Sequence, residues 1–408
     1  MTLPAVVPSP NGGIFAPADG VAADLPHDRA GDRSDSIQRI GQHASVRDLA
    51  WLLLSPSLLS PSRFPMRLGD PTDPCLFGPT AADAVMAMLQ RLDADPRDLD
   101  AELAASGERR LGRYAERLLG AWLARAPGVT ISALNLPVRS AAAVGETDGA
   151  GVRRTLGECD ALFETCTGAR EHWEMAVKFY LYVDDGGQSL APTAPTAPTA
   201  PTDTSRLSLT ARTPETASLL AGCDAFVGAG LADRFDWKLQ RLIDHQLPLS
   251  AHPELLALAP GPWDARMFVK GRLFYPLGQW HTLTAGAPAL AEDHARGWWA
   301  TLDTWLAWSR KAHCEWTELA RLDWLAPLKF DEAQGRQRIS DVATFAKALE
   351  RHFDPGTGAK LPMQVAALQP ALGGRPAYEL SRGFIVPNTW PDSASRFRAS
   401  GTVVTHHQ

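Results

Sequence analysis

The chain has 408 residues, a formal net charge of −6, 45% hydrophobic residues and 21% charged residues. This length supports a sizeable core and favours two or three folding units. The negative net charge argues against a protein that coats nucleic acid by bulk electrostatics, but it leaves a local basic groove open. Five widely spaced cysteines favour reduced thiols in a cytoplasmic protein over a disulfide framework. The longest apolar run, residues 49–54, is too short to span a bilayer, so we expect no membrane association.

The front third of the sequence is predicted to be helical. Residues 1–42 are rich in Pro, Gly, Ala and Asp without periodicity, which is typical of a disordered tail. Residues 43–108 are then predicted to form a helical extension. Its helices are expected at residues 46–59, 80–92 and 98–105.

The hydrophobic period then changes, and a mixed core is predicted over residues 109–280. Its elements are expected to be a helix at 109–126, strands at 130–138, 154–163 and 173–183, a helix at 232–246 and a strand at 267–275. An Ala-Pro-Thr repeat within residues 185–205 indicates an inserted flexible linker. The fold class is therefore α/β, in its α+β form, with the order helix, three strands, helix, strand.

A Trp-rich accessory region of mixed structure is expected over residues 281–392. It contains a predicted helix at 342–352 and a predicted strand at 378–386. Residues 393–408 are expected to be a loose tail. The sequence does not indicate what the accessory region does.

Two neighbouring predicted strands carry charged residues with strand periodicity. Alternation places Glu158 and Asp160 on one face of the first strand, and Glu174, Ala176 and Lys178 on one face of the next. If the strands are adjacent, three carboxylates and a lysine line one patch of a sheet. Such a patch can bind Mg²⁺ through oxygen and support hydrolysis of a phosphodiester. The alternative is a solvent-exposed sheet face with incidental salt bridges.

These strands resemble the core of the PD-(D/E)XK phosphodiesterase superfamily, especially its Holliday-junction-resolvase branch. The resemblance lies in residues 157–162 and 176–180, in the preceding helix at 112–123, and in the element order. It implies that Asp160 and Glu174 bind Mg²⁺ or Mn²⁺ and that Lys178 is the catalytic lysine. It also implies a metal-binding role for Glu116 on that helix. Glu116 could equally be an exposed residue that pairs with a neighbouring arginine.

More narrowly, the chain resembles a bacterial family called domain of unknown function 1853, which is grouped with these nucleases. The motifs that carry this resemblance are residues 172–181, 233–238, 245–250, 271–276 and 323–327. The resemblance covers about residues 45–390, and it implies a restriction-endonuclease-like core.

One departure from the superfamily pattern concerns the third strand. The superfamily has an acid two residues before the lysine, whereas this chain has Ala176 there. Glu174 lies on the same face, about 13 Å from Lys178 along the strand. Either Glu174 is a displaced ligand, or the site lacks one ligand that Glu158 or Glu116 could replace.

Three further residues are candidates for contact with a substrate. Arg113 belongs to a helix with several arginines, which could track phosphates or could simply be a solvated face. Lys238 and Gln246 lie two turns apart on the second core helix, where they could contact phosphate or water. Their alternative role is helix capping and packing. Cys159, Cys166 and His172 have no recognisable zinc spacing.

The sequence thus predicts a cytoplasmic, metal-dependent nuclease or nuclease-like protein with nucleic acid, DNA or RNA, as its partner. A competing hypothesis is a catalytically inactive nuclease fold that binds nucleic acid or a protein. A weaker third hypothesis is an enzyme that acts on another phosphate ester.

Overall fold

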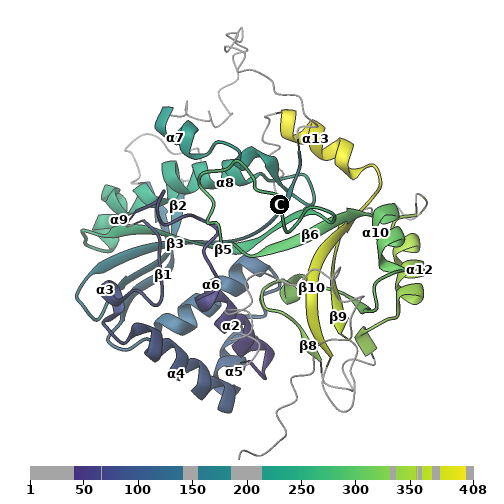
Figure 1. Cartoon of the computed structure of the whole chain (residues 1–408). Helices are drawn as coiled ribbons and strands as arrows, with labels where there is room; N and C mark the ends of the chain where they lie inside the picture. The colour runs from purple at the N-terminus through teal and green to yellow at the C-terminus, as the bar shows by residue number, and fades with distance from the viewer. Residues whose placement is uncertain are drawn as a thin grey trace, which may run out of the picture.

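The computed structural model describes residues 41–65, 67–140, 155–184, 214–330, 337–354, 356, 361–369 and 377–400. These residues form an α+β fold, as predicted, in which one mixed sheet of ten strands runs through the molecule (Figure 1). The tail expected at residues 1–42 lies almost wholly outside the described residues, and the linker expected at 185–205 lies wholly outside them.

The described part of residues 43–108 contains four helices, of which three were expected from the sequence and α3 was not. They are α2 (Ala44–Leu54), α3 (Pro74–Phe77), α4 (Ala81–Ala94) and α5 (Arg97–Ser106). The prediction that the first of them reaches residue 59 is wrong, because α2 ends at Leu54. Ser55 is extended, with a ψ of 151°. It precedes Pro56, whose ring disfavours a helical conformation in the residue before it.

The core contains the predicted helix, three strands, helix and strand in that order, but α7 and β4, which were not predicted, lie between the third strand and the second core helix. Its elements are α6 (Leu111–Leu123), β1 (Thr130–Arg139), β2 (Thr155–Glu164), β3 (Arg170–Tyr182), α7 (Pro214–Leu219), η2 (Cys223–Ala225), β4 (Phe226–Gly228), α8 (Phe235–Arg241), η3 (Leu242–Gln246), η4 (Leu247–Ala251), α9 (Pro253–Leu258) and β5 (Asp264–Pro276). The second core helix begins at Phe235, not at residue 232. It changes to π-helix in η3 and to 3-10 helix in η4.

The sheet has the order β1-β2-β3-β5-β6-β10-β9-β7, with β4 paired to β3 and β8 paired to β10. Strands β1, β2 and β3 are antiparallel, whereas β5 runs parallel to β3. Gly271 permits close pairing of β5 with β3, because a Cβ there would collide with the carbonyl oxygen of Lys178. Its φ of 148° is also one that side chains rarely allow.

The region after residue 280 extends this same sheet. Its elements are β6 (Arg296–Thr301), α10 (Leu302–Ser309), β7 (Glu315–Glu318), η5 (Arg321–Trp324), β8 (Lys329–Phe330), α12 (Val342–His352), β9 (Met363–Gln369), β10 (Ala377–Val386) and α13 (Trp390–Ser400). The loose tail expected from residue 393 is wrong as far as Ser400, because α13 is helical there. Trp390 anchors α13 by donating its indole N–H to the carbonyl oxygen of Ala229 at 2.8 Å.

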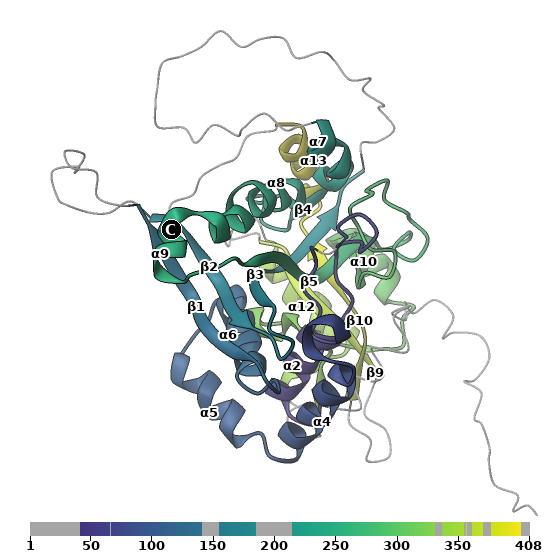
Figure 2. The same ribbon diagram turned by 90° about the vertical axis from the view of Figure 1, so that its left-hand side faces the viewer.

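Hydrophobic clusters cover both faces of the sheet. Trp173 and Phe179 of β3 pack on one face with α2 and α6, whereas Ala176 and Tyr180 pack on the other face with α8. This alternation is what the period of β3 predicts. Figure 2 shows β1 and β2 side by side with α6 beneath them and α9 beside their upper end. The candidate site lies where β2 leaves this regular packing.

Candidate active site

The regular pairing of β2 is interrupted on both sides at Asp160. Its backbone pairing with β3 ends at Ala161 and Trp173, and beyond that point carboxylates take over the bonding between the strands. The amide of Met175 donates to Asp160 Oδ2 at 2.8 Å, and the amide of Asp160 lies 3.4 Å from Glu174 Oε1. The two predicted acids therefore meet across an opening between neighbouring strands.

The partner strand β1 is irregular at the same level. Leu134 pairs with Ala161 and Leu136 with Cys159, so Asn135 lies opposite Asp160. Asn135 has a φ of 51°, a left-handed conformation that asparagine tolerates better than most residues. Backbone irregularity on one strand and lost pairing on the other leave Asp160 outside the regular ladder. Such departures are often found at functional sites.

Glu174 is fully buried, and polar neighbours fix both of its carboxylate oxygens. His172 Nε2 donates to Oε1 at 2.8 Å, and Gln246 Nε2 donates to Oε2 at 2.5 Å. His172 is also fully buried, and its Nδ1 has no hydrogen-bond partner among the described residues. Both partners of Glu174 hold the carboxylate in one orientation, as the groups behind a metal ligand do.

A second acidic group surrounds Arg113 of α6. Arg113 Nη1 donates to Glu116 Oε2 at 2.7 Å, to Glu158 Oε1 at 2.6 Å and to Asn135 Oδ1 at 2.9 Å. Nη2 donates to the other oxygen of Glu158 at 3.1 Å. Glu116 and Glu158 therefore both pair with Arg113, and for Glu116 this is the arginine pairing that was the alternative to a metal-binding role. The charge of Arg113 is already balanced by these two carboxylates, so it is a weak candidate for contact with a phosphate.

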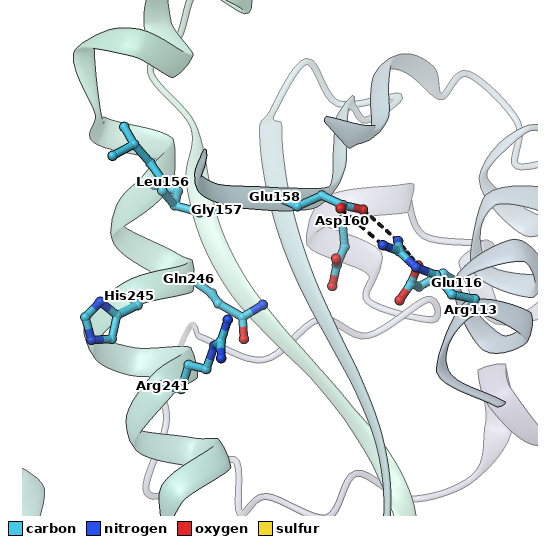
Figure 3. A pocket seen from close by; sticks show the side chains of 10 residues that line it. Arg113, Glu116, Leu156, Gly157, Glu158, Asp160, Arg241, His245 and Gln246 are labelled. Atoms are coloured by element: carbon cyan, nitrogen blue, oxygen red, sulfur yellow. Dashed lines mark hydrogen bonds and ion pairs between the residues drawn. The ribbon is translucent and has the colours of Figure 1, made fainter. Parts of the chain in front are cut away.

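Asp160, Glu116, Glu158 and Arg113 line one side of a cavity of about 240 Å³, whereas the fully buried Glu174 lies behind Asp160 and Gln246 and does not line it. Figure 3 shows Asp160, Glu116 and Glu158 on one side, with Gln246 and Arg241 facing them from the helix that α8 and η3 form. The ring of His245, on the same helix, points away from the carboxylates. The cavity thus lies between α6 and β2, which carry the acids, and the helix of α8 and η3, which carries Arg241 and Gln246.

Arg241 is a charged lining residue that was not predicted from the sequence. It is exposed, and its side chain forms no hydrogen bond or ion pair with any residue in the part of the chain that the structure describes. A guanidinium that is free in this way suits a phosphate. Its spacing of three residues from Lys238 was the signal in the sequence, because residues three apart are neighbours on a helix.

Burial and like charge shift the acidity of the site. Burial, followed by the nearby Glu174, raises the pKa of Asp160 to about 8. Burial also raises the pKa of Glu116, although Arg113 opposes this effect. Burial, followed by the nearby charge of Lys178, lowers the pKa of Lys238 to about 8. Carboxylates this close together that are partly desolvated favour a bound cation.

Lys178, which the sequence analysis proposed as the catalytic lysine, has a partner elsewhere. Its Nζ donates to Asp233 Oδ2 at 2.6 Å, and Tyr180 donates its hydroxyl to the same oxygen at 2.8 Å. Ala176, between Glu174 and Lys178, packs in the apolar cluster with Phe235. The structure therefore brings Asp160 and Glu174 together, whereas Lys178 lies farther along the strand in a separate ion pair.

Cys159 and His172 do come together in space, although their spacing in the sequence gave no sign of it. Single ligand atoms of Cys159, His172 and Glu174 lie within 4.8 Å of one another, and all three residues are buried. This set would suit Zn²⁺, whereas the oxygen-only pair of Asp160 and Glu174 suits Mg²⁺ or Mn²⁺. Burial raises the pKa of the Cys159 thiol to about 12, which disfavours the thiolate that a metal requires.

The chain belongs to the family described as Domain of unknown function (DUF1853), whose model matches residues 47–198 and 205–386. This confirms the narrower of the two resemblances seen in the sequence. Comparison with curated proteins and with solved structures gives no match. None of the helices in the described ranges is both long and apolar enough to cross a membrane.

Proposed function

We propose that the chain is a divalent-metal-dependent phosphodiesterase that cleaves nucleic acid at the cavity between β2 and η3. The observation that carries this proposal is the opening at Asp160, where two carboxylates from adjacent strands take over the bonding between them. The order of the core elements and the resemblance to PD-(D/E)XK nucleases support the same function. Oxygen ligands favour Mg²⁺ or Mn²⁺ as the ion.

The groups that line the cavity, and the buried groups next to them, each have a defined part in this proposal. Asp160 and Glu174 would hold the cation, and Glu116 or Glu158 could supply a further oxygen. A bound divalent cation lowers the pKa of a water molecule and offsets charge on the phosphate. His172 and Gln246 keep Glu174 oriented. Arg241 would bind a phosphate of the substrate from the opposite side of the cavity.

The test is cleavage of a panel of duplex, branched and single-stranded DNA and RNA with Mg²⁺ or Mn²⁺. Asp160→Asn and Glu174→Gln are each expected to lower the cleavage rate at least about 100-fold, because each removes a charged ligand. Glu164→Gln is the matched control, since Glu164 is an acid on the same strand β2 but has a side chain that is 46% exposed and lies 3.4 Å from Arg170. Cleavage that persists in both site variants would contradict the proposal.

An inactive nuclease fold that binds nucleic acid is the second candidate function. The observation that favours it is the ion pair between Lys178 and Asp233, which leaves the expected lysine away from the two acids. The same panel separates the two functions. Binding without cleavage under any metal condition would favour the inactive fold, whereas cleavage that requires Asp160 excludes it.

The identity of the metal-binding set is testable through Cys159. Cys159→Ser is expected to change the affinity for Mn²⁺ by less than about twofold, because the proposed set binds through oxygen alone. Isothermal titration with Mn²⁺ and with Zn²⁺ would measure both affinities. A large loss of Zn²⁺ affinity in this variant, with little Mn²⁺ binding by the wild type, would instead assign the metal to Cys159, His172 and Glu174.

A further inference from the structure

Two lysines are candidates for the lysine of this site, and their surroundings differ. The ammonium group of Lys178 is 2.6 Å from Asp233 Oδ2, and its side chain is 28% exposed. Its charge is therefore already balanced by a carboxylate that also accepts the hydroxyl of Tyr180. Lys238 is half-buried on α8, and it forms no ion pair within the ranges that the structure describes. The charge of Lys238 is the one left to act on Asp160 and Glu174.

A continuous chain of hydrogen bonds joins Lys238 to Glu174. Lys238 Nζ donates to Gln246 Oε1 at 2.8 Å, and Gln246 Nε2 donates to Glu174 Oε2 at 2.5 Å. An ammonium group only donates, whereas a carboxylate only accepts. The amide of Gln246 is therefore fixed with its oxygen toward Lys238 and its nitrogen toward Glu174. Reversing the amide would break both bonds.

The π-helical turn makes this chain of bonds possible. In an uninterrupted α-helix, residues eight apart are rotated by about 80° beyond two full turns. The segment Leu242–Gln246 is π-helical, and a π-turn contains more residues per turn than an α-turn. The extra residue brings Gln246 back beneath Lys238. Such π-turns are frequently found at functional sites.

We propose that Lys238, rather than Lys178, is the lysine of this site, and that it positions Glu174 through the amide of Gln246. Lys238 is thus a positioning residue. Its ammonium charge also interacts favourably with the nearby carboxylates of Asp160 and Glu174. The consequence for cleavage rests on the proposed function, but the bonding itself does not.

The direct test measures the side-chain amide of Gln246 by NMR, with its signals assigned from their loss in Gln246→Leu. In the metal-free wild type, we expect a resolved pair of amide signals that exchange slowly with solvent. Lys238→Met should lower this exchange protection about 10-fold or more, because the amide can then rotate. Lys238→Arg, which keeps the donor, should restore much of it, and Lys178→Met should leave it unchanged. Equal protection of the Gln246 amide from exchange in Lys238→Met and in the wild type would overturn the proposal.

Cleavage gives the second readout. Lys238→Met is expected to lower kcat about 10- to 100-fold with little change in KM, whereas Lys178→Met should lose far less. Lys347→Met on the exposed face of α12 is the control for removal of a lysine charge. A larger loss of kcat in Lys178→Met than in Lys238→Met would overturn the proposal. If the wild type cleaves none of the substrates, the proposed function fails, and the amide signals of Gln246 still decide the role of Lys238.

Discussion

Asp160→Asn is expected to stabilise the metal-free protein by about 2–4 kcal/mol at pH 8 and by little at pH 4. The pKa of Asp160 is raised from 3.8 to about 8, mainly by burial and then by Glu174. The folded chain therefore binds this proton more tightly than the unfolded chain. The stability that the wild type gains from protonated Asp160 is fully present below about pH 4 and is lost as the pH rises toward about 8. Asparagine is neutral at every pH in this range, so the Asp160→Asn variant does not lose this stability as the pH rises.

Urea unfolding at several pH values, with metal removed by a chelator, measures the effect. With saturating Mn²⁺ at pH 8, the wild type should instead be more stable than Asp160→Asn, because a bound ion stabilises only the protein that keeps its ligand. Glu164→Gln should show neither effect, since Glu164 is an exposed acid on the same strand. A metal-free Asp160→Asn variant that is less stable than the wild type at pH 8 would contradict a raised pKa of Asp160.

The pairing of Asp160 with Glu174 follows from features that a sequence displays. Strand alternation depends on local sterics alone, and in β3 it places Trp173 and Phe179 on one face and Ala176 and Tyr180 on the other. The order of the core elements was likewise visible in the hydrophobic period. The position of α12 was predicted to the residue, because its amphipathic pattern and the cap at Asp341 are both local signals.

Features that depend on tertiary packing were not visible in the sequence. Gln246 meets Lys238 in a helix that changes to a π-turn after Arg241, and no local pattern marks that change. The pairing of Arg113 with Glu158 joins residues 45 positions apart. Of the strands after residue 280, β10 was predicted at 378–386, whereas β6, β7, β8 and β9 were missed for a related reason. Their partners are distant in the chain, and buried strands there do not alternate between apolar and polar residues.

Position 176 gives the second prediction: moving the acid from Glu174 to the superfamily position is expected to destroy the site. The Glu174→Ala/Ala176→Glu double variant should not recover Mn²⁺ affinity. It should also be less stable than Glu174→Ala by about 3 kcal/mol or more. Ala176 is 5% exposed and packs with Tyr180 and Phe235, so a glutamate there would bury an uncompensated charge. Isothermal titration and urea unfolding measure the two effects.

The single variants Ala176→Glu and Ala176→Gln separate charge from volume, because the two side chains have nearly the same size. Any extra loss of stability in the glutamate variant at pH 8 reports the burial of charge, and it should shrink toward pH 4 as the carboxylate becomes protonated. Recovery of Mn²⁺ binding by the double variant would show that position 176 faces the cation after all. The packing argues otherwise. The strands open where Asp160 lies opposite Glu174, which is two residues before Ala176. We therefore expect the acid of this strand to act from position 174 and not from position 176.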